Sequence, residues 1–591
     1  MKSRISEQIA AFLLPTNQTS IREVHTVQLR GAEILIKVLK QEGIHTIFGY
    51  PGGVLLDIYD ELHKGHIRHI LVRHEQGAVH AADGFARASG KVGVALVTSG
   101  PGASNTVTGI ANAYMDSIPI VVLTGQVPTH LIGTDAFQEV DIVGITRPCT
   151  KHNFLIKRVD QLAKTIHEAF HIARSGRPGP VLIDLPKDVM AAMTEYEPQT
   201  PQKIEENKPR PASKKAFYVM DLIAESTKPM ILSGGGVILG GAAEELRKMA
   251  WLTRMPVSST LMGLGAFPGS DPLWLGMPGM HGTYYANMAI SHCDLLIAIG
   301  MRFDDRVTGK IDHFAPNAKI VHVDVDPSSI NKNVMVEVPI VSDCKSALQS
   351  FNALLEQQKF SVTDEQRREW FDQIAAWRQE NPLSYCHSDT EIKPQFVIET
   401  LYKLTKGQAI ITTEVGQNQM WAAQFYNYDE PNTFLSSGGL GTMGYGFPAA
   451  LGAKIAFPDK LVVDIAGDGS IQMNIQEMAT AIQDNIPVKI VLLNNGYLGM
   501  VRQWQQLFYG KRYSHTDMTY QPDFLKLAEA YGWLGLRATK PDEVEAVLKQ
   551  GLEAPGPALM DFRICREECV YPMVRPGGPI HEMALGREMA N

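Results

Sequence analysis

The chain has 591 residues, 45% of them hydrophobic and 20% charged, and its formal net charge at pH 7 is −8. This length and apolar content predict roughly three or four globular domains, while an acidic balance without a Lys/Arg-rich stretch argues against nucleic-acid binding. The six cysteines are scattered and form no C-x-x-C pair, so reduced thiols are favoured over a zinc site.

Residues 1–28 are interpreted as an N-terminal extension. Its apolar run, at 9–14, is too short to cross a membrane, and the longer apolar core of a secretory signal is missing. An organellar transit peptide stays open as an alternative, although Glu7 and Glu23 interrupt the acid-poor pattern of such peptides. We therefore expect a cytoplasmic protein that does not bind membranes.

Three blocks of the chain alternate short apolar strands with amphipathic helices. We predict a first domain at 29–192, a middle domain at 215–352 and a third domain at 395–565. Near-continuous Val/Ile/Leu runs are typical of parallel strands buried on both faces, and their alternation with helices predicts an α/β fold of three doubly wound parallel-sheet domains. The expected strands are 69–73, 92–98, 119–124, 230–233, 295–300, 320–325, 409–413, 461–466, 488–493 and 558–562.

Polar segments separate and follow these blocks. Residues 193–214 are rich in Pro, Lys and Glu and are expected to form an extended linker. A second linker, 353–394, is predicted to contain a helix near 365–379. Residues 566–591 form a C-terminal tail, whose Pro- and Gly-rich stretch at 571–581 is a candidate lid over an active site.

The most specific motif is Gly467-Asp468-Gly469-Ser470, followed after 24 residues by Asn494-Asn495, with a predicted helix at 473–485 between them. Both halves follow predicted strands, and ligands of open α/β sheets lie beyond the carboxyl ends of strands. Mg²⁺ prefers oxygen ligands and commonly binds one or two protein groups together with phosphates. The expected ligands are the Asp468 carboxylate, the Asn495 side-chain carbonyl and the Tyr497 backbone carbonyl. Taken singly, a Gly-Asp-Gly sequence after a strand is more often a plain turn, and an Asn pair is more often a cap. Together, the two halves of the motif favour a binding site for a magnesium-bound diphosphate.

A glutamate in the first block also stands directly after a predicted strand, as Asp468 and Asn494-Asn495 do. Glu75 follows the strand predicted at 69–73 and opens the next helix. For an isolated glutamate at a helix start, stabilisation by the helix dipole is the commoner explanation.

Taken together, these segments resemble the thiamine diphosphate enzymes, and most specifically the acetolactate (acetohydroxyacid) synthase family. The likeness extends from residue 29 to residue 580. It is carried by F-G-Y-P-G-G at 48–53, H-E-Q-G-A-V-H-A-A-D-G-F-A-R at 74–87, T-S-G-P-G-A-S-N at 98–105, G-T-D-A-F-Q-E at 133–139, S-G-R-P-G-P-V-L-I-D-L-P-K-D at 175–188, G-M-H-G-T at 279–283, R-F-D-D-R-V-T-G at 302–309, S-G-G-L-G-T-M-G-Y-G-F-P at 437–448 and G-M-V-R-Q-W at 499–504.

The resemblance implies roles around thiamine diphosphate. Glu75 would donate a hydrogen bond to the aminopyrimidine ring, and Gln138 would lie near the thiazolium. Met443 would bend the cofactor, and the Gly441 backbone would accept its amino group. The aminopyrimidine side would also be lined by Tyr50, Pro51, Gly52, Pro101 and Asn105. The diphosphate would contact Val415, Gly416, Gln417, Asn418, Gly469 and Ser470.

The resemblance also implies substrate contacts. Lys187 would lie along the substrate channel, while Arg306 and Trp504 would hold the second substrate. Arg can clamp a keto-acid carboxylate bidentately, and an indole can pack the extra methyl group of 2-ketobutyrate. Two alternatives stay open: Trp504 as a core aromatic residue, and Arg306 paired with a neighbouring aspartate, Asp304 or Asp305.

The middle domain resembles a flavin-binding module, although its glycine run at 234–240 misses the G-x-G-x-x-G spacing by one residue. The resemblance, not the composition, implies FAD. Its implied contacts are Arg177, Gly234, Gly235, Gly236, Met280, His281, Gly300, Arg302, Asp324, Val325 and Asp343.

The function implied is that of acetolactate synthase: decarboxylation of pyruvate and ligation of the remaining unit to pyruvate or 2-ketobutyrate, in valine, leucine and isoleucine biosynthesis. Since Glu75 and Asp468 belong to different domains, we expect the site to form between subunits of a homodimer or homotetramer. A small regulatory subunit that confers valine feedback is a further possible partner. Two positions depart from the family pattern: Asn418 stands where His is usual, and Val54 where Ala is common.

Three alternatives compete with this assignment. A flavin oxidoreductase of the pyruvate oxidase type shares the cofactor motifs but fits 302–306 and 499–504 less well. An NAD-dependent dehydrogenase is suggested by G-x-G-x-x-G at 439–444 with Asp464, yet Pro448 follows closely and such short matches are often accidental. A binding protein without catalysis is disfavoured by the joint presence of Glu75, Asp468 and Asn495.

Overall fold

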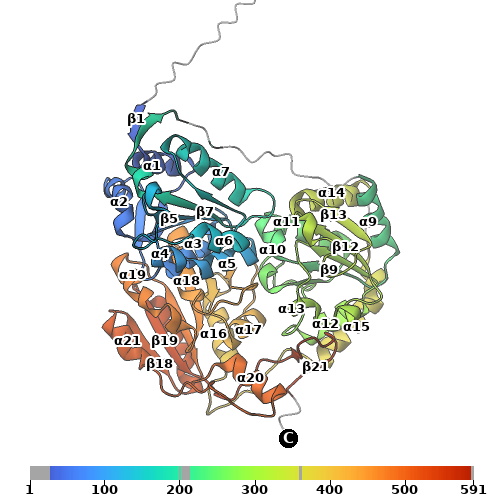
Figure 1. Cartoon of the computed structure of the whole chain (residues 1–591). Helices are drawn as coiled ribbons and strands as arrows, with labels where there is room; N and C mark the ends of the chain where they lie inside the picture. Colours follow the sequence, from blue (N-terminus) through green and yellow to red (C-terminus); the bar gives the residue numbers. More distant parts are fainter. Residues whose placement is uncertain (1–26, 199–200, 202–212, 359–361, 587–591) are drawn as a thin grey trace, which may run out of the picture.

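The computed structural model describes residues 27–198, 201, 213–358 and 362–586. Within them the chain forms three α/β bodies, each built on a parallel sheet (Figure 1). The predicted fold of three doubly wound parallel-sheet domains is therefore confirmed. The extension predicted at 1–28 lies outside the described residues, apart from its last two. Among the described residues, no helix is both long and apolar enough to cross a bilayer.

The first domain has six parallel strands in the order β3-β2-β4-β5-β7-β6, and a short antiparallel pair, β1–β8, beside them. Its strands are β1 (Val27–Arg30), β2 (Thr46–Tyr50), β3 (Arg68–Leu71), β4 (Gly93–Val97), β5 (Ile120–Gln126), β6 (His152–Leu155), β7 (Val181–Pro186) and β8 (Met193–Tyr196). Its helices are α1 (Gly31–Gln41), α2 (Leu56–His63), α3 (Glu75–Ser89), α4 (Pro101–Ser104), α5 (Val107–Asp116), α6 (Ile142–Thr146), α7 (Leu162–Arg174) and α8 (Lys187–Ala191). Successive residues of β5 enter different cores, because side chains alternate across a strand.

The middle domain has five parallel strands in the order β10-β9-β11-β12-β13. They are β9 (Pro229–Ser233), β10 (Val257–Ser259), β11 (Leu295–Ile299), β12 (Lys319–Asp324) and β13 (Val338–Val341). The helices are α9 (Ser213–Glu225), α10 (Gly235–Leu239), α11 (Ala243–Thr253), α12 (Tyr284–His292), α13 (Asp305–Thr308), α14 (Cys344–Gln357) and α15 (Asp364–Glu380). The helix predicted near 365–379 is α15, and it buries Trp370 and Trp377 in a core of this domain.

The third domain has six parallel strands in the order β15-β14-β16-β17-β19-β18. They are β14 (Ile410–Thr413), β15 (Phe434–Leu435), β16 (Val462–Gly467), β17 (Lys489–Asn494), β18 (Leu534–Ala538) and β19 (Ala558–Arg563). The helices are α16 (Pro394–Thr405), α17 (Gln417–Phe425), α18 (Gly446–Ala456), α19 (Met478–Gln483), α20 (Gly499–Phe508), α21 (Phe524–Ala530) and α22 (Val544–Glu553). Counted within each domain, the strands of the first and third parallel sheets follow the same order.

The helix predicted at 473–485 is only partly correct. Two 3₁₀ turns, Ile471–Met473 and Ile475–Glu477, come first, and α19 begins at Met478. Side-chain contacts explain the difference, because Asn474 Nδ2 donates to the Gly444 carbonyl at 2.7 Å and Glu477 accepts hydrogen bonds from the first domain. Tertiary contacts outweigh helix propensity in this segment.

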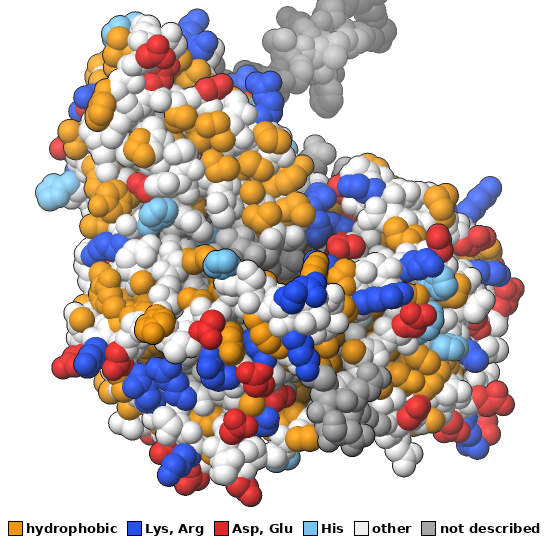
Figure 2. Space-filling view, turned by 60° about the horizontal axis from the view of Figure 1, so that its bottom comes forward, with side chains coloured by type: hydrophobic (Ala, Val, Ile, Leu, Met, Phe, Trp, Pro, Cys, Tyr) orange, Lys and Arg blue, Asp and Glu red, His pale blue; other side chains and the backbone are white. Residues whose placement is uncertain are grey.

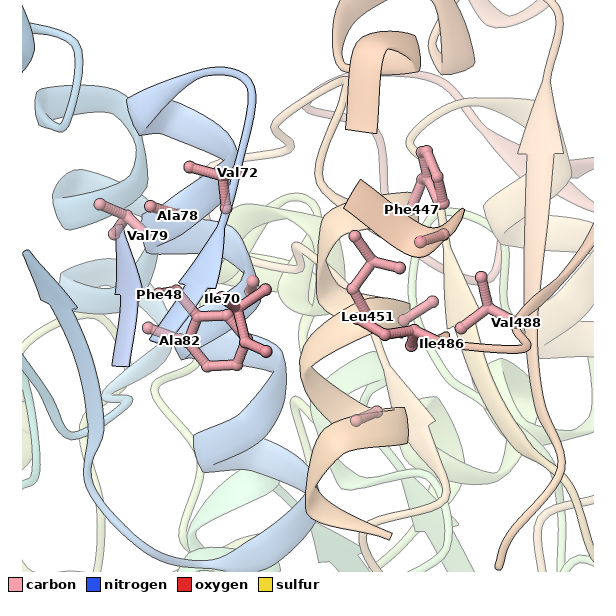
Figure 3. Close-up of a cluster of buried hydrophobic side chains, with 14 of the residues drawn as sticks. Phe48, Ile70, Val72, Ala78, Val79, Ala82, Phe447, Leu451, Ile486 and Val488 are labelled. Atoms are coloured by element: carbon pink, nitrogen blue, oxygen red, sulfur yellow. The ribbon is translucent and has the colours of Figure 1, made fainter. Parts of the chain in front are cut away.

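One hydrophobic core joins the first and third domains through α3 and α18, as Figure 3 shows for Phe48 and Ile70 on one side and Phe447 and Leu451 on the other. The two helices approach so closely that only glycine fits at the crossing. A Cβ atom at Gly452 would overlap the Ala81 carbonyl oxygen. This contact fixes the two domains that carry the predicted site relative to each other.

The C-terminal tail packs between the middle and third domains. β20 (Met573–Val574) pairs with β21 (Met583–Ala584), and Val574 N donates to the Met280 carbonyl at 2.8 Å. Gln503 of α20 donates to the Val570 carbonyl at 2.9 Å. The tail therefore touches both domains that line the cavity described next.

Candidate active site

A cavity of about 600 Å³ lies between the middle and third domains. The predicted residues of the diphosphate and magnesium site line it, as do those of the second-substrate site. Of the lining residues that the structure describes, Met115 is the one contributed by the first domain. The predicted site residues on its wall are Met280, His281, Arg302, Arg306, Val415, Gly416, Gln417, Asn418, Gly441, Met443, Asp468, Gly469, Ser470, Asn495, Tyr497 and Trp504.

The metal motif is assembled by two neighbouring parallel strands. β16 and β17 pair so that Gly467 faces Leu493, and Asp468 and Asn495 follow at the same edge. Asp468 is 1% exposed, and burial raises the pKa of its carboxyl to about 7. Asn495 Oδ1 accepts from Tyr497 N at 3.0 Å. This hard-oxygen set fits Mg²⁺, because a divalent cation would offset the cost of burying the carboxylate.

The diphosphate side of the cavity lies at the start of α17. Gly416 precedes the helix with a φ of 146°, a backbone conformation that favours glycine, and the nine-residue helix points its N-terminus at the cavity. Gln417 is held in place, since its Nε2 donates to Gln503 Oε1 at 2.8 Å and its Oε1 accepts from Asn495 Nδ2 at 3.2 Å. Free amides at a helix start are a suitable place for phosphate oxygens.

Asn418, which departs from the family pattern, directs its amide nitrogen toward two backbone carbonyl groups of the third domain. Its Nδ2 donates to the carbonyl oxygens of Glu414 at 3.1 Å and Ile465 at 2.8 Å. Both amide hydrogens are thereby engaged with the protein. Asn418 thus ties the backbone that follows β14 to that of β16.

A buried glutamate, which was not among the residues predicted from the sequence, binds the backbone of the loop that carries Gly441 and Met443. Glu414 Oε2 accepts from Gly444 N at 2.7 Å and Oε1 from Phe447 N at 3.0 Å. Burial raises the pKa of the Glu414 carboxyl above its ordinary value. The loop reaches the cavity with Gly441 at a φ of 71°, a left-handed conformation suited to glycine.

The same loop is also held by the first domain, through another set of residues that the sequence did not reveal. Asp116 accepts from Gly439 N at 2.7 Å and from Arg87 Nη2 at 2.8 Å. Tyr445 donates its hydroxyl hydrogen to Asp83 at 2.8 Å, and Arg87 binds the same carboxylate. The two carboxylates and the guanidinium are buried and pair with one another, which offsets part of the cost of burying their charges.

Arg306 and Trp504, the residues predicted to hold the second substrate, lie next to each other on the wall of the cavity. The Arg306 guanidinium lies 5.7 Å from the centre of the indole ring, a cation–π distance. Its Nη1 also lies 3.2 Å from Asp305 Oδ2, so the alternative ion pair is present as well. Asp304 instead caps α13 and accepts from the Arg306 backbone amide at 3.1 Å.

The other predicted residues gather in the first domain. Asn105 Nδ2 donates to Glu75 Oε2 at 2.9 Å, and Glu75 is the first residue of α3. Gly52 and Gly102 pack on Thr98 at the end of β4, and Gly100 lies against Gln138. Gln138 has a φ of 59° in an exposed loop. We call the residues predicted around the aminopyrimidine and the thiazolium in this domain the first-domain half-site: Tyr50, Pro51, Gly52, Glu75, Pro101, Asn105 and Gln138.

Within one chain, the structure does not bring this half-site to the cavity. None of its residues is among the described residues that line the cavity, and neither is Lys187, which is exposed at the start of α8. The cavity therefore holds the diphosphate side of the predicted site without its aminopyrimidine side.

The residues implied for FAD lie on the middle domain and at its boundary with the first. Met280, His281 and Arg302 line the cavity, while Arg177 reaches across from the first domain to Asp326 at 3.3 Å. Burial raises the pKa of the Asp324 carboxyl, which stands at the end of β12, to about 6. Such a strand-end carboxylate fits a ribose hydroxyl. The other implied residues lie at strand ends or helix starts: Gly234, Gly235, Gly236, Gly300, Val325 and Asp343.

Sequence models of three protein domains match the chain. The N-terminal TPP binding domain of thiamine pyrophosphate enzymes matches residues 29–145, the central domain residues 218–351, and the C-terminal TPP binding domain residues 414–562. Together they place the cavity and the first-domain half-site inside the matched segments.

Several named proteins are similar to nearly the whole chain. The acetolactate synthase large subunit of Haemophilus influenzae is 48% identical over 570 residues, which cover 95% of this chain and 99% of that protein. The acetolactate synthase large subunit of Mycobacterium tuberculosis is 50% identical over 569 residues, covering 95% and 92%. The probable acetolactate synthase large subunit of Methanocaldococcus jannaschii is 50% identical over 564 residues, covering 93% and 94%.

Proposed function

The chain belongs to the acetolactate synthase large subunits of the thiamine pyrophosphate enzyme family, and from that premise we propose that it condenses two 2-keto acids with loss of carbon dioxide. Pyruvate is the donor, and pyruvate or 2-ketobutyrate the acceptor. The products, 2-acetolactate and 2-aceto-2-hydroxybutyrate, lead to valine, leucine and isoleucine. The observation that carries the proposal is one cavity lined by Asp468 and Asn495 as well as Arg306 and Trp504.

Thiamine diphosphate supplies the electron sink for decarboxylation when it is bound. We propose that the start of α17 and Gly469 hold its diphosphate, while Asp468, Asn495 and the Tyr497 carbonyl hold the accompanying Mg²⁺. Met443 and Gly441 stand where they can shape the cofactor between these ends. FAD is proposed for the middle domain, with Arg302, His281 and Asp324 among its contacts.

The chain's own residues then perform three tasks. Glu75 donates a proton in a hydrogen bond to the aminopyrimidine ring, with its carboxyl oriented by Asn105. Arg306 binds the carboxylate of the acceptor keto acid in exchange for Asp305, and Trp504 packs against its alkyl group. The tail at 571–581 helps to exclude water, because it packs on both domains that line the cavity.

A second copy of the chain is proposed to complete the site. The first-domain half-site supplies the aminopyrimidine contacts that the cavity lacks, and the cavity supplies the diphosphate and magnesium contacts that the half-site lacks. Large apolar side chains are exposed next to both. Phe137 is 87% exposed beside Gln138. Leu440 is exposed in the loop that carries Gly441 and Met443, and the exposed Met473 lies against Gly444 of the same loop. On the face that Figure 2 shows, acidic and basic side chains are interspersed among the described residues. We expect a homodimer or homotetramer, with a small regulatory subunit as a further partner.

An assay with pyruvate, thiamine diphosphate and Mg²⁺ tests the function by measuring acetolactate. Glu75→Gln is expected to lower the rate at least about a hundredfold, because the amide cannot give up a proton in the same way. Glu545→Gln is a matched control, since Glu545 also lies in the first turn of a helix but does not line the cavity. Wild-type rates in Glu75→Gln would contradict the role of Glu75. Oxygen uptake without acetolactate would instead assign the chain to the oxidase type.

A further inference from the structure

Glu477 is a buried glutamate of the third domain that none of the predicted roles uses. It ends the second 3₁₀ turn after the metal motif and is 0% exposed. It does not line the cavity, and both of its carboxylate oxygens are engaged by protein donors. Glu477 is therefore placed to act on other residues rather than on a substrate.

The donors to Glu477 stand directly before Glu75. Arg73 N donates to both oxygens, at 3.0 and 3.1 Å, and His74 N donates to Oε1 at 3.0 Å. Thr480 holds the carboxylate from the other side, with its hydroxyl 2.7 Å from Oε2. Since α3 begins at Glu75, the third domain thus fixes the backbone from which the predicted activating glutamate projects.

The space around the Glu477 carboxylate is tightly filled, so the start of α3 has little room to move. Gly77 lies one turn into α3, and a Cβ atom there would come within 2.6 Å of Glu477 Oε1. Within the first domain, His74 Nδ1 accepts from Gln76 N at 3.1 Å and completes the cap of the helix. The Thr480 hydroxyl also lies 3.2 Å from the carbonyl oxygen of Leu71, at the end of β3. The start of α3 is thus held between its own cap and Glu477.

We infer that Glu477 is a positioning residue, which sets the carboxyl of Glu75 for the cofactor through the backbone amides of Arg73 and His74. The inference rests on the proposed function, because the orientation of Glu75 matters for catalysis only if Glu75 contacts thiamine diphosphate. A displacement of about 1 Å at a catalytic group can lower a rate by about a hundredfold. The rigid connection through Glu477 prevents such a displacement.

Two substitutions at position 477 separate positioning from charge. Glu477→Ala removes the acceptor from both amides. Glu477→Gln keeps it, because the amide oxygen can accept from Arg73 N and His74 N while the amide nitrogen donates to the Thr480 hydroxyl. Asp294→Ala is the matched control. Asp294 also accepts from two backbone amides, of Thr227 at 2.8 Å and Lys228 at 3.0 Å, but belongs to the middle domain.

The first measurement is amide hydrogen exchange in peptides covering residues 72–78, on the full chain without cofactor. Glu477→Ala is expected to raise the exchange rate about tenfold or more, whereas Glu477→Gln and Asp294→Ala leave it within about threefold of wild type. The second is the acetolactate assay. Glu477→Ala is expected to lower kcat about tenfold to a hundredfold, with KM for pyruvate and Kd for thiamine diphosphate within about threefold, and Glu477→Gln to restore kcat.

Gly77→Ala provides an independent variant, because it pushes on the same contact while Glu477 stays in place. Gly77→Ala is expected to lower kcat in the same way as Glu477→Ala. It therefore tests the inference even if Glu477→Ala fails to fold. A normal kcat in either variant, alongside an inactive Glu75→Gln, overturns the positioning role and leaves the proposed function intact. Full activity of Glu75→Gln would instead remove the proposed function.

Discussion

At Arg306 the guanidinium has two neighbours, and the balance between them decides what it can bind. Its pair with Asp305 is exposed on both sides, and exposed pairs of this kind are worth at most about 1 kcal/mol. A keto-acid carboxylate can therefore take the place of Asp305 at little cost. The Trp504 ring lies 5.7 Å from the guanidinium, and we propose that it offers an apolar surface to the alkyl group of the acceptor.

Replacing Trp504 by Leu is expected to lower the share of 2-aceto-2-hydroxybutyrate when pyruvate and 2-ketobutyrate compete. Packing of one extra methylene group discriminates by about tenfold or more, and most of that preference should disappear with the indole. The measurement is the ratio of the two products under competition. Trp251→Leu serves as control, since Trp251 is exposed on the middle domain outside the cavity. An unchanged ratio in Trp504→Leu would exclude this residue from acceptor selection.

Glu477 also predicts how stability depends on pH. Burial raises the pKa of its carboxyl from the ordinary 4.5 to about 7, although Arg73 and the amides of Arg73 and His74 act in the opposite direction. The folded state then binds the proton more tightly than the unfolded state, so this group destabilises the fold increasingly as pH rises from 4.5 to 7. Glu477→Gln cannot ionise. Its melting temperature relative to wild type is expected to increase between pH 5 and pH 8; a constant difference would contradict the raised pKa.

Residues differ in how far the sequence could predict them. Asp468 and Asn495 were found because a local motif follows each of two apolar strands, and parallel strands bring their ends together. Glu477 and Asp116 act on backbone amides far away in sequence, up to 404 residues for Glu477, and a backbone amide carries no residue-type signal. Such residues become visible only when the domains are placed against each other.

Among the elements, the buried parallel strands were predicted best, because both of their faces are apolar and the signal does not depend on register. The segment at 473–485 was predicted less well, since Asn474 and Glu477 bind groups outside it and interrupt the helix. The only indication of the α3–α18 crossing in the sequence is the presence of glycines and alanines, such as Gly84 and Gly452. Small residues on a helix do not identify the helix that they will meet.

This crossing supports a stability prediction. In Gly452→Ala the new methyl group would overlap the Ala81 carbonyl oxygen, and a backbone oxygen in the middle of a helix cannot move aside. Overpacking of this kind costs about 1–3 kcal/mol or more. We expect a clearly lower melting temperature, measured by thermal unfolding. Gly556→Ala is the control, because a Cβ atom there meets nothing within 4 Å. Equal melting temperatures for the two variants would show that α3 and α18 are less tightly packed.

For the whole molecule, the decisive feature is the separation of the first-domain half-site from the cavity. α3 and α18 lock the first and third domains of one chain together, so a hinge motion that closes Glu75 onto its own Asp468 would have to break a buried core. Association of two chains needs no such disruption, and a two-fold axis would produce two equivalent sites at once. A site shared between two chains would therefore disrupt less buried packing than a site closed within one chain.

Subunit complementation tests this arrangement. Glu75→Gln and Asp468→Ala are each expected to be inactive alone, because every site lacks one essential group. In a heterodimer, one site combines both defects and the other combines wild-type Glu75 with wild-type Asp468. Random mixing of the two chains should therefore restore about a quarter of the wild-type sites, seen as acetolactate formation in co-refolded or co-expressed protein. If each site were built within one chain, every chain in the mixture would keep its defect, and no activity would return at any mixing ratio.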